Sequence, residues 1–130
     1  MASPTSLVDW LVDSVPPAIK LRMRIPNDKD AIDILETDGD TLRSIIIDTI
    51  LSLKDRYLRV GLPVEVFNQV FDAAWDLHKK GPYHYVFLLE RLKKKYADNE
   101  VVLRFLNDVG IREEDMLPLY VYYLRKTHQI

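Results

Sequence analysis

The chain has 130 residues, the length of one ordinary domain, with 48% hydrophobic and 29% charged residues and only 4 glycines, which excludes disordered and fibrous proteins. It has no cysteine, which excludes disulfides, thiolate metal sites and cysteine nucleophiles. The formal net charge of −2 excludes a strong overall attraction to nucleic acid or anionic lipid. We therefore expect one globular domain over residues 1–130.

Neither a membrane span nor a secretory signal is visible in the sequence. The longest purely apolar runs, such as residues 45–47 and 86–89, are far shorter than the roughly 20 residues that a spanning helix needs. The first six residues, MASPTS, lack the basic start and apolar stretch of a signal peptide. We expect a soluble, cytoplasmic protein that does not bind membranes.

The first third of the chain mixes two kinds of pattern. Residues 3–15 carry one apolar stripe behind a Ser-Pro start, which predicts a capped helix. Residues 18–25 alternate apolar and basic side chains, which is typical of a half-buried strand. Because no partner strand is evident, we predict an extended segment there that lies on the helices. Residues 28–35 have the pattern of a short helix.

The strongest apolar pattern lies at residues 41–60 and predicts a long helix. Asp40 or Thr41 can cap its start, and Gly61 is suited to its end. One stripe contains Leu42, Ile45, Ile46, Thr49, Ile50, Leu53 and Tyr57, and a second contains Ile47, Leu51 and Leu58. A helix that is apolar on more than one side is usually wrapped by neighbours, so we predict that this helix forms the centre of the fold. A second stripe left open would instead become a dimer interface.

Four further segments show helical periodicity, at residues 63–80, 83–96, 99–109 and 115–126. Proline near the start or glycine near the end marks most of them, and Pro118 is tolerable in the last if it falls in the first turn. Together these patterns predict an all-α fold, a compact antiparallel bundle of six or seven helices.

No motif in the sequence points to catalysis, a cofactor or a metal. The acidic residues between 28 and 40 fail the calcium-loop pattern, because with Gly39 at loop position 6 the first and last ligand positions are isoleucines. His78 lies on an apolar helix face, where we expect a hydrogen-bonded core residue, and His84 is expected near the surface. The dispersed glycines and serines match no phosphate loop or nucleophile turn.

The remaining signal is a set of aromatic and basic side chains on otherwise polar helix faces. Its members are Tyr83, Phe87, Arg91, Lys94 and Tyr122. Tyrosine, phenylalanine and arginine are enriched where proteins bind one another. We predict a non-enzymatic interaction module, an adaptor or assembly domain that presents a helical surface to a partner protein or to a second copy.

A nucleic-acid accessory protein is the alternative. It would use a local basic patch made of Lys79, Lys80, Arg91, Lys94 and Lys95. Such binding requires that the cations converge in the fold and that affinity falls steeply with salt.

Overall fold

The structure is a computed structural model that describes residues 37–129, and every structural statement below concerns that range. Residues 38–129 belong to one compact unit. The helix predicted for residues 3–15, the extended segment near 18–25 and the short helix at 28–35 lie outside the described residues. The single domain expected over residues 1–130 therefore stays a prediction.

The described residues form six helices and no strand, which confirms the predicted all-α bundle. The helices are α4 (Gly39–Arg59), α5 (Val64–Trp75), α6 (Leu77–Lys80), α7 (Pro82–Lys95), α8 (Glu100–Asp108) and α9 (Glu113–Lys126). The long helix predicted at 41–60 and the helices predicted at 83–96, 99–109 and 115–126 are present, with ends shifted by one or two residues.

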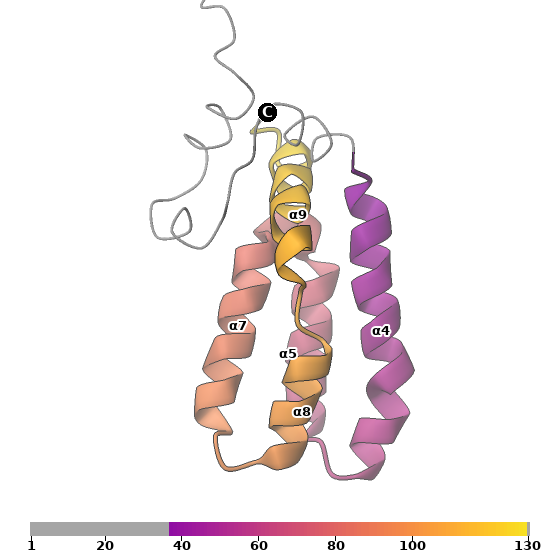
Figure 1. Cartoon of the computed structure of the whole chain (residues 1–130), viewed down its shortest axis with the longest axis vertical. Coiled ribbons are helices and arrows are strands. Elements are labelled where there is room, and N and C mark those ends of the chain that lie inside the picture. The colour runs from indigo at the N-terminus through magenta and orange to yellow at the C-terminus, as the bar shows by residue number, and fades with distance from the viewer. Residues whose placement is uncertain (1–36, 130) are drawn as a thin grey trace, which may run out of the picture. The chain divides into compact units, whose positions relative to one another are not determined.

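The helices stand side by side, and α8 and α9 follow one another along a single column (Figure 1). α4 packs against α5 and α9, and α7 packs against α5, α8 and α9. The short α6 packs against α7 and α9. Short links join each helix, or the column of α8 and α9, to the next. Neighbouring helices therefore run antiparallel, as expected for a bundle.

Gly61 ends α4 as predicted, in a left-handed conformation with φ of 102°. The Leu62 amide donates to the Tyr57 carbonyl at 2.9 Å, and the Gly61 amide donates to the Leu58 carbonyl at 3.2 Å. These two bonds satisfy carbonyls that the last helical turn leaves unpaired, and a glycine adopts this φ without strain. The chain is thereby turned sharply into α5.

The helix predicted over residues 63–80 is broken at Asp76 into α5 and α6. Both Nε and Nη2 of Arg43 donate to the Trp75 carbonyl, at 3.0 and 2.8 Å, and the His78 ring nitrogen lies 3.0 Å from the same oxygen. Because side chains occupy that carbonyl, the Lys79 amide bonds to the Asp76 carbonyl instead. A contact between α4 and α5, which periodicity cannot reveal, therefore breaks the helix.

The helix that is most fully enclosed is α9, not the predicted centre at 41–60. Six consecutive residues of α9 and one further residue are buried, and they are Leu117, Pro118, Leu119, Tyr120, Val121, Tyr122 and Leu124. On α4, by contrast, Ile45 and Leu51 are 55% and 48% exposed. The neighbours of α4 cover one side of it only, so its two apolar stripes are not both wrapped.

The position of Pro118 also differs from the prediction. α9 begins at Glu113, so the proline lies beyond the first turn, where it removes a helical hydrogen bond at a cost of about 3 kcal/mol. Burial of the residues around Pro118 offsets this cost, since a fully buried large apolar side chain contributes about 1.5–3 kcal/mol. Packing against α4, α6 and α7 thus keeps the helix intact.

Candidate functional site

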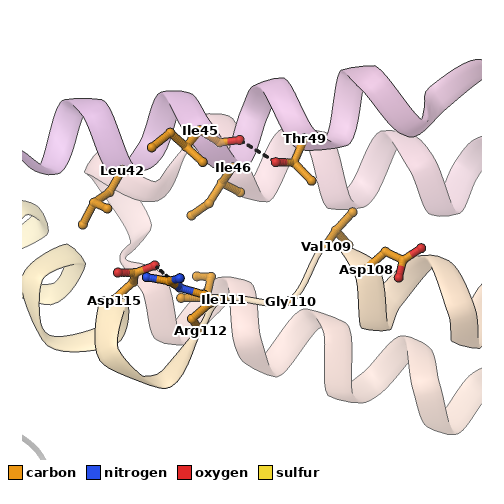
Figure 2. A pocket seen from close by; sticks show the side chains of 10 residues that line it. All are labelled: Leu42, Ile45, Ile46, Thr49, Asp108, Val109, Gly110, Ile111, Arg112 and Asp115. Atoms are coloured by element: carbon orange, nitrogen blue, oxygen red, sulfur yellow. Dashed lines mark hydrogen bonds and ion pairs between the residues drawn. The ribbon is translucent and has the colours of Figure 1, made fainter.

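An apolar groove of about 310 Å³ lies between α4 and the link that joins α8 to α9 (Figure 2). Its lining residues are Leu42, Ile45, Ile46, Thr49, Asp108, Val109, Gly110, Ile111, Arg112 and Asp115. The isoleucines of α4 form one wall, and Ile111 faces them from the link (Figure 2). The lining residues therefore offer mainly hydrocarbon to an occupant.

The groove exists because the column of α8 and α9 is interrupted beside α4. α8 ends at Asp108 and α9 begins at Glu113, so residues 109–112 line the groove as a non-helical link. Gly110 has no side chain, and a Cβ added there would meet only the carbonyl oxygens of Asn107 and Leu106, at 3.5 and 3.8 Å. Ile45, on the α4 wall of this groove, stays 55% exposed.

The polar groups of the groove already have partners within the chain. The Thr49 hydroxyl donates to the Ile45 carbonyl at 2.8 Å, and Arg112 Nε lies 3.3 Å from Asp115 Oδ2. Asp108 accepts a short hydrogen bond from the Tyr57 hydroxyl. Burial raises the pKa of Tyr57 above its usual value, and the hydrogen bond to Asp108 raises it further. These groups are thus suited to framing an apolar ligand rather than to proton transfer.

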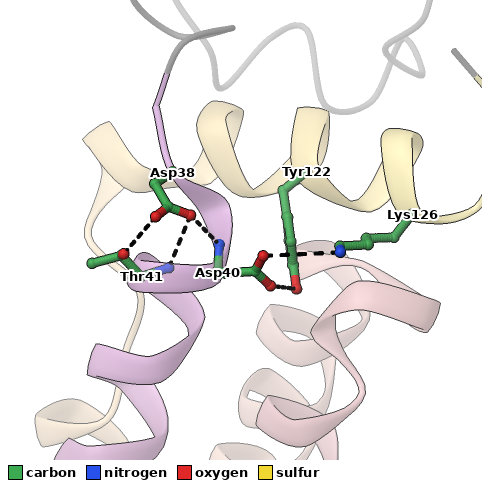
Figure 3. A network of polar contacts seen from close by, with 5 residues as sticks. All are labelled: Asp38, Asp40, Thr41, Tyr122 and Lys126. Carbon is green, nitrogen blue, oxygen red and sulfur yellow. Dashed lines mark hydrogen bonds and ion pairs between the residues drawn. The ribbon is translucent and has the colours of Figure 1, made fainter.

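A polar network joins the start of α4 to α9 (Figure 3). The Tyr122 hydroxyl donates to Asp40 Oδ1 at 2.5 Å, and Lys126 Nζ lies 3.9 Å from Asp40 Oδ2. Asp38, rather than the predicted Asp40 or Thr41, caps α4 by accepting from both of their amides. The hydrogen bond from the Thr41 hydroxyl, followed by the one from the Thr41 amide, lowers the pKa of Asp38.

Tyr122 is therefore not part of an open interface, contrary to the prediction from its helix face. It is buried against Gly39, whose missing side chain leaves room for the tyrosine ring. Burial, followed by the hydrogen bond to Asp40, raises the pKa of Tyr122 to about 12. The residue joins two helices and does not face a partner.

The other predicted interface residues lie on α7. Phe87 is 50% exposed, and Arg91 and Lys94 are exposed on the same outward side. Tyr83 is half-buried, with its ring centroid 5.3 Å from that of Tyr120. The structure thus leaves a small aromatic and basic surface on α7, and its role in binding stays a prediction.

The predicted nucleic-acid patch is split along α7. Lys79 and Lys80 precede the helix, whereas Lys94 and Lys95 lie in its last turn, and a helix of 14 residues is about 21 Å long. Arg91 lies between them. Burial, followed by the nearby charges of Lys80 and Arg91, lowers the pKa of His84. The five basic residues therefore do not form one compact cluster.

Sequence reasoning missed where exposed apolar surface is concentrated. Five of the six exposed large apolar side chains in the described chain belong to the α4–α5 hairpin, namely Ile45, Leu51, Val60, Val64 and Trp75, while Phe87 is the sixth. The sequence did contain a signal for this, because the helix at 41–60 has apolar residues on two sides. The predicted alternative, a dimer interface on an uncovered second stripe, includes Leu51, whereas the predicted interface residues themselves are on later helices.

Within residues 37–129, no cluster of histidine and acidic side chains could hold a metal ion, and no helix is long and apolar enough to cross a membrane. No family model, no curated protein and no solved structure matches the chain. Function must therefore be inferred from the geometry of the chain itself.

Proposed function

We propose that this chain is a non-enzymatic protein-binding module that takes up a short apolar helical segment of a partner protein in the groove beside α4. The observation that carries the proposal is the exposed Ile45 on the wall of an apolar groove in an otherwise well-packed bundle. Contiguous apolar surface that is rimmed by polar residues marks protein-binding sites and ligand-binding grooves.

The shape of the lining favours a helical segment. The α4 wall extends from Leu42 to Thr49, which is about two helical turns, and a helix offers apolar side chains at matching intervals of three and four residues. Arg112 and Asp115 at the rim can orient a partner by charge while the isoleucines supply the contact area. This division between an apolar centre and a polar rim is common in protein interfaces.

The groups in the groove support binding over catalysis. Thr49 is the one hydroxyl-bearing lining residue, and it donates to a backbone carbonyl. Catalysis by a nucleophile requires a base within hydrogen-bond reach of it. Asp108 and Asp115 are each bound by another side chain, Tyr57 and Arg112 respectively.

The test is to select helical peptides from a displayed library against the full chain and to measure their affinity by fluorescence anisotropy. Ile45→Glu introduces a charge on the groove wall without removing core packing. We expect it to weaken selected peptides at least about tenfold, which corresponds to about 1.4 kcal/mol. Circular dichroism should show that the variant keeps its helical content.

Phe87→Asp is the matched control, since it places a carboxylate at an equally exposed apolar residue of another helix. Peptide affinity should be unchanged in this variant. Peptides that bind Ile45→Glu normally and lose affinity for Phe87→Asp would reject the groove and favour the surface on α7. Failure to select any apolar peptide would reject the groove as well.

A further inference from the structure

We propose that the outward face of α7 binds a short acidic segment of a partner protein that carries an apolar side chain beside its carboxylates. Phe87, Arg91 and Lys94 form this face, and all three are exposed. At 100° per residue, Arg91 and Lys94 lie within about 40° of Phe87 around the helix axis. Tyr85 and Leu89, on the opposite side of α7, are buried in the bundle, so the helix is held with this face towards solvent.

This face is separate from the groove beside α4. No residue of α7 lines that groove, and α7 and α4 stand on opposite sides of the column of α8 and α9 (Figure 1). The two surfaces can therefore be tested separately, and either can bind without the other.

The cations of this face have no carboxylate partner in the described part of the chain. α7 contains four basic residues and one acidic residue, Glu90. Three cations elsewhere in residues 37–129 form ion pairs, whereas none joins Arg91 or Lys94 to a carboxylate. A partner carboxylate can therefore bind Arg91 without displacing another one, and a guanidinium can hold a carboxylate through two parallel hydrogen bonds.

The charges also favour a peptide over two other occupants. A second copy that docked through the same face would set cations against cations, which opposes association. A nucleic acid would bring its phosphates close to Glu90, which is exposed about 60° around the helix from Phe87. A peptide carries groups of both signs, so it can place carboxylates beside Arg91 and Lys94 and an amide or a basic side chain beside Glu90.

The spacing along α7 specifies the pattern of the segment. At 1.5 Å per residue, Arg91 lies about 6 Å and Lys94 about 10.5 Å along the helix axis from Phe87. An extended segment advances about 3.3 Å per residue. With its apolar side chain on the Phe87 ring, such a segment therefore brings the residues two and three positions away close to the two cations. We expect acidic residues at those two positions.

The test is to select short random segments from a displayed library against the full chain and to measure their affinity by fluorescence anisotropy. We expect the selected segments to show this pattern. Arg91→Glu combined with Lys94→Glu should weaken them at least about tenfold, because it sets carboxylates against carboxylates. Phe87→Ala should weaken them at least about fivefold, because it removes the apolar contact.

Arg56→Glu combined with Arg59→Glu is the matched control. It reverses two exposed cations with the same spacing at the end of another helix, and so changes the net charge equally. Affinity for the acidic segments should stay within about twofold, because charges on a distant surface are screened by salt. Ile45→Glu should also keep this binding, which separates it from peptide binding at the groove. Circular dichroism of each variant excludes unfolding as the cause of a lost interaction.

Three outcomes would overturn the proposal. The first is that no acidic segment is selected whose binding survives Ile45→Glu. The second is an equal loss of affinity in the two charge-reversal variants, which would mean that net charge alone attracts the segments. The third is a labelled oligonucleotide that binds more tightly than the segments and is lost in R91E/K94E, which would assign this face to nucleic acid.

Discussion

Replacing Phe105 with alanine should lower the free energy of unfolding by about 3–5 kcal/mol, the range measured for large aromatic residues deleted from protein cores. Phe105 has no exposed surface, and its ring meets that of Tyr57 edge-on at 5.3 Å and that of Phe67 at 6.2 Å. These rings join α8 to α4 and α5. Urea unfolding of the purified chain, followed by circular dichroism, measures the loss.

Phe87→Ala is the control for this experiment because it removes the same atoms from a half-exposed side chain. It should change the free energy of unfolding by about 1 kcal/mol or less, as surface substitutions usually do. Equal losses in the two variants would mean that Phe105 is not at the centre of the core. The arrangement of α8 beside α4, on which the groove depends, would then be wrong.

The positions of the helices could be predicted because each carries its own periodicity and end signals. On α7 the helical periodicity groups Tyr85, Leu88, Leu89 and Leu92 on one apolar side, and all of these are buried. Phe87 was placed among polar neighbours by the same periodicity, and it is exposed. Periodicity specifies the sides of one helix, and this information is local to the segment.

Which neighbour covers a given side depends on pairings between distant segments. Leu51 and Ile45 belong to the two apolar stripes of residues 41–60, and both stay exposed because α5 and α9 cover the side of α4 that carries Ile50 and Tyr57. The groove likewise depends on where the column of α8 and α9 is interrupted relative to α4. Neither the covering of α4 by its neighbours nor the position of this interruption leaves a spacing pattern in the sequence. The candidate site could therefore not be located from the sequence.

Tyr122 is a single residue whose surroundings could not be predicted from periodicity, for the same reason. Its helix face groups it with exposed basic residues, which predicted an interface position. In the fold it is buried because Gly39, far away in the sequence, has no side chain and leaves room for the ring. The Tyr122 hydroxyl also donates a hydrogen bond to Asp40 Oδ1 at 2.5 Å. A glycine at the start of a helix gives no sign of which ring will occupy the space beside it.

Gly39→Ala should therefore destabilise the fold, although alanine favours helices over glycine by about 1 kcal/mol. An added Cβ would lie 2.3 Å from both Cβ and Cγ of Tyr122, far closer than atoms approach in proteins. Since the Tyr122 Cβ is fixed to the α9 backbone, α9 itself must move away from α4. Overpacking of this kind costs about 1–3 kcal/mol, so we expect a net loss of about 2 kcal/mol in urea unfolding.

Gly110→Ala is the matched control, because the nearest atom to its added Cβ is the Asn107 carbonyl oxygen at 3.5 Å, an ordinary contact. It should change the stability by about 0.5 kcal/mol or less. A Gly39→Ala variant as stable as Gly110→Ala would show that Tyr122 does not pack against the start of α4.

The alkaline titration of Tyr122 provides an independent measure of the same contact. Its pKa in the fold is about 12, against an ordinary value of 10.0, because burial and the bond to Asp40 favour the neutral phenol. The stability it contributes is therefore complete below pH 10 and is lost as the pH rises towards 12. If Gly39→Ala displaces the ring, ultraviolet absorbance should show one tyrosine titrating nearer its ordinary pKa, and the alkaline loss of stability should become smaller.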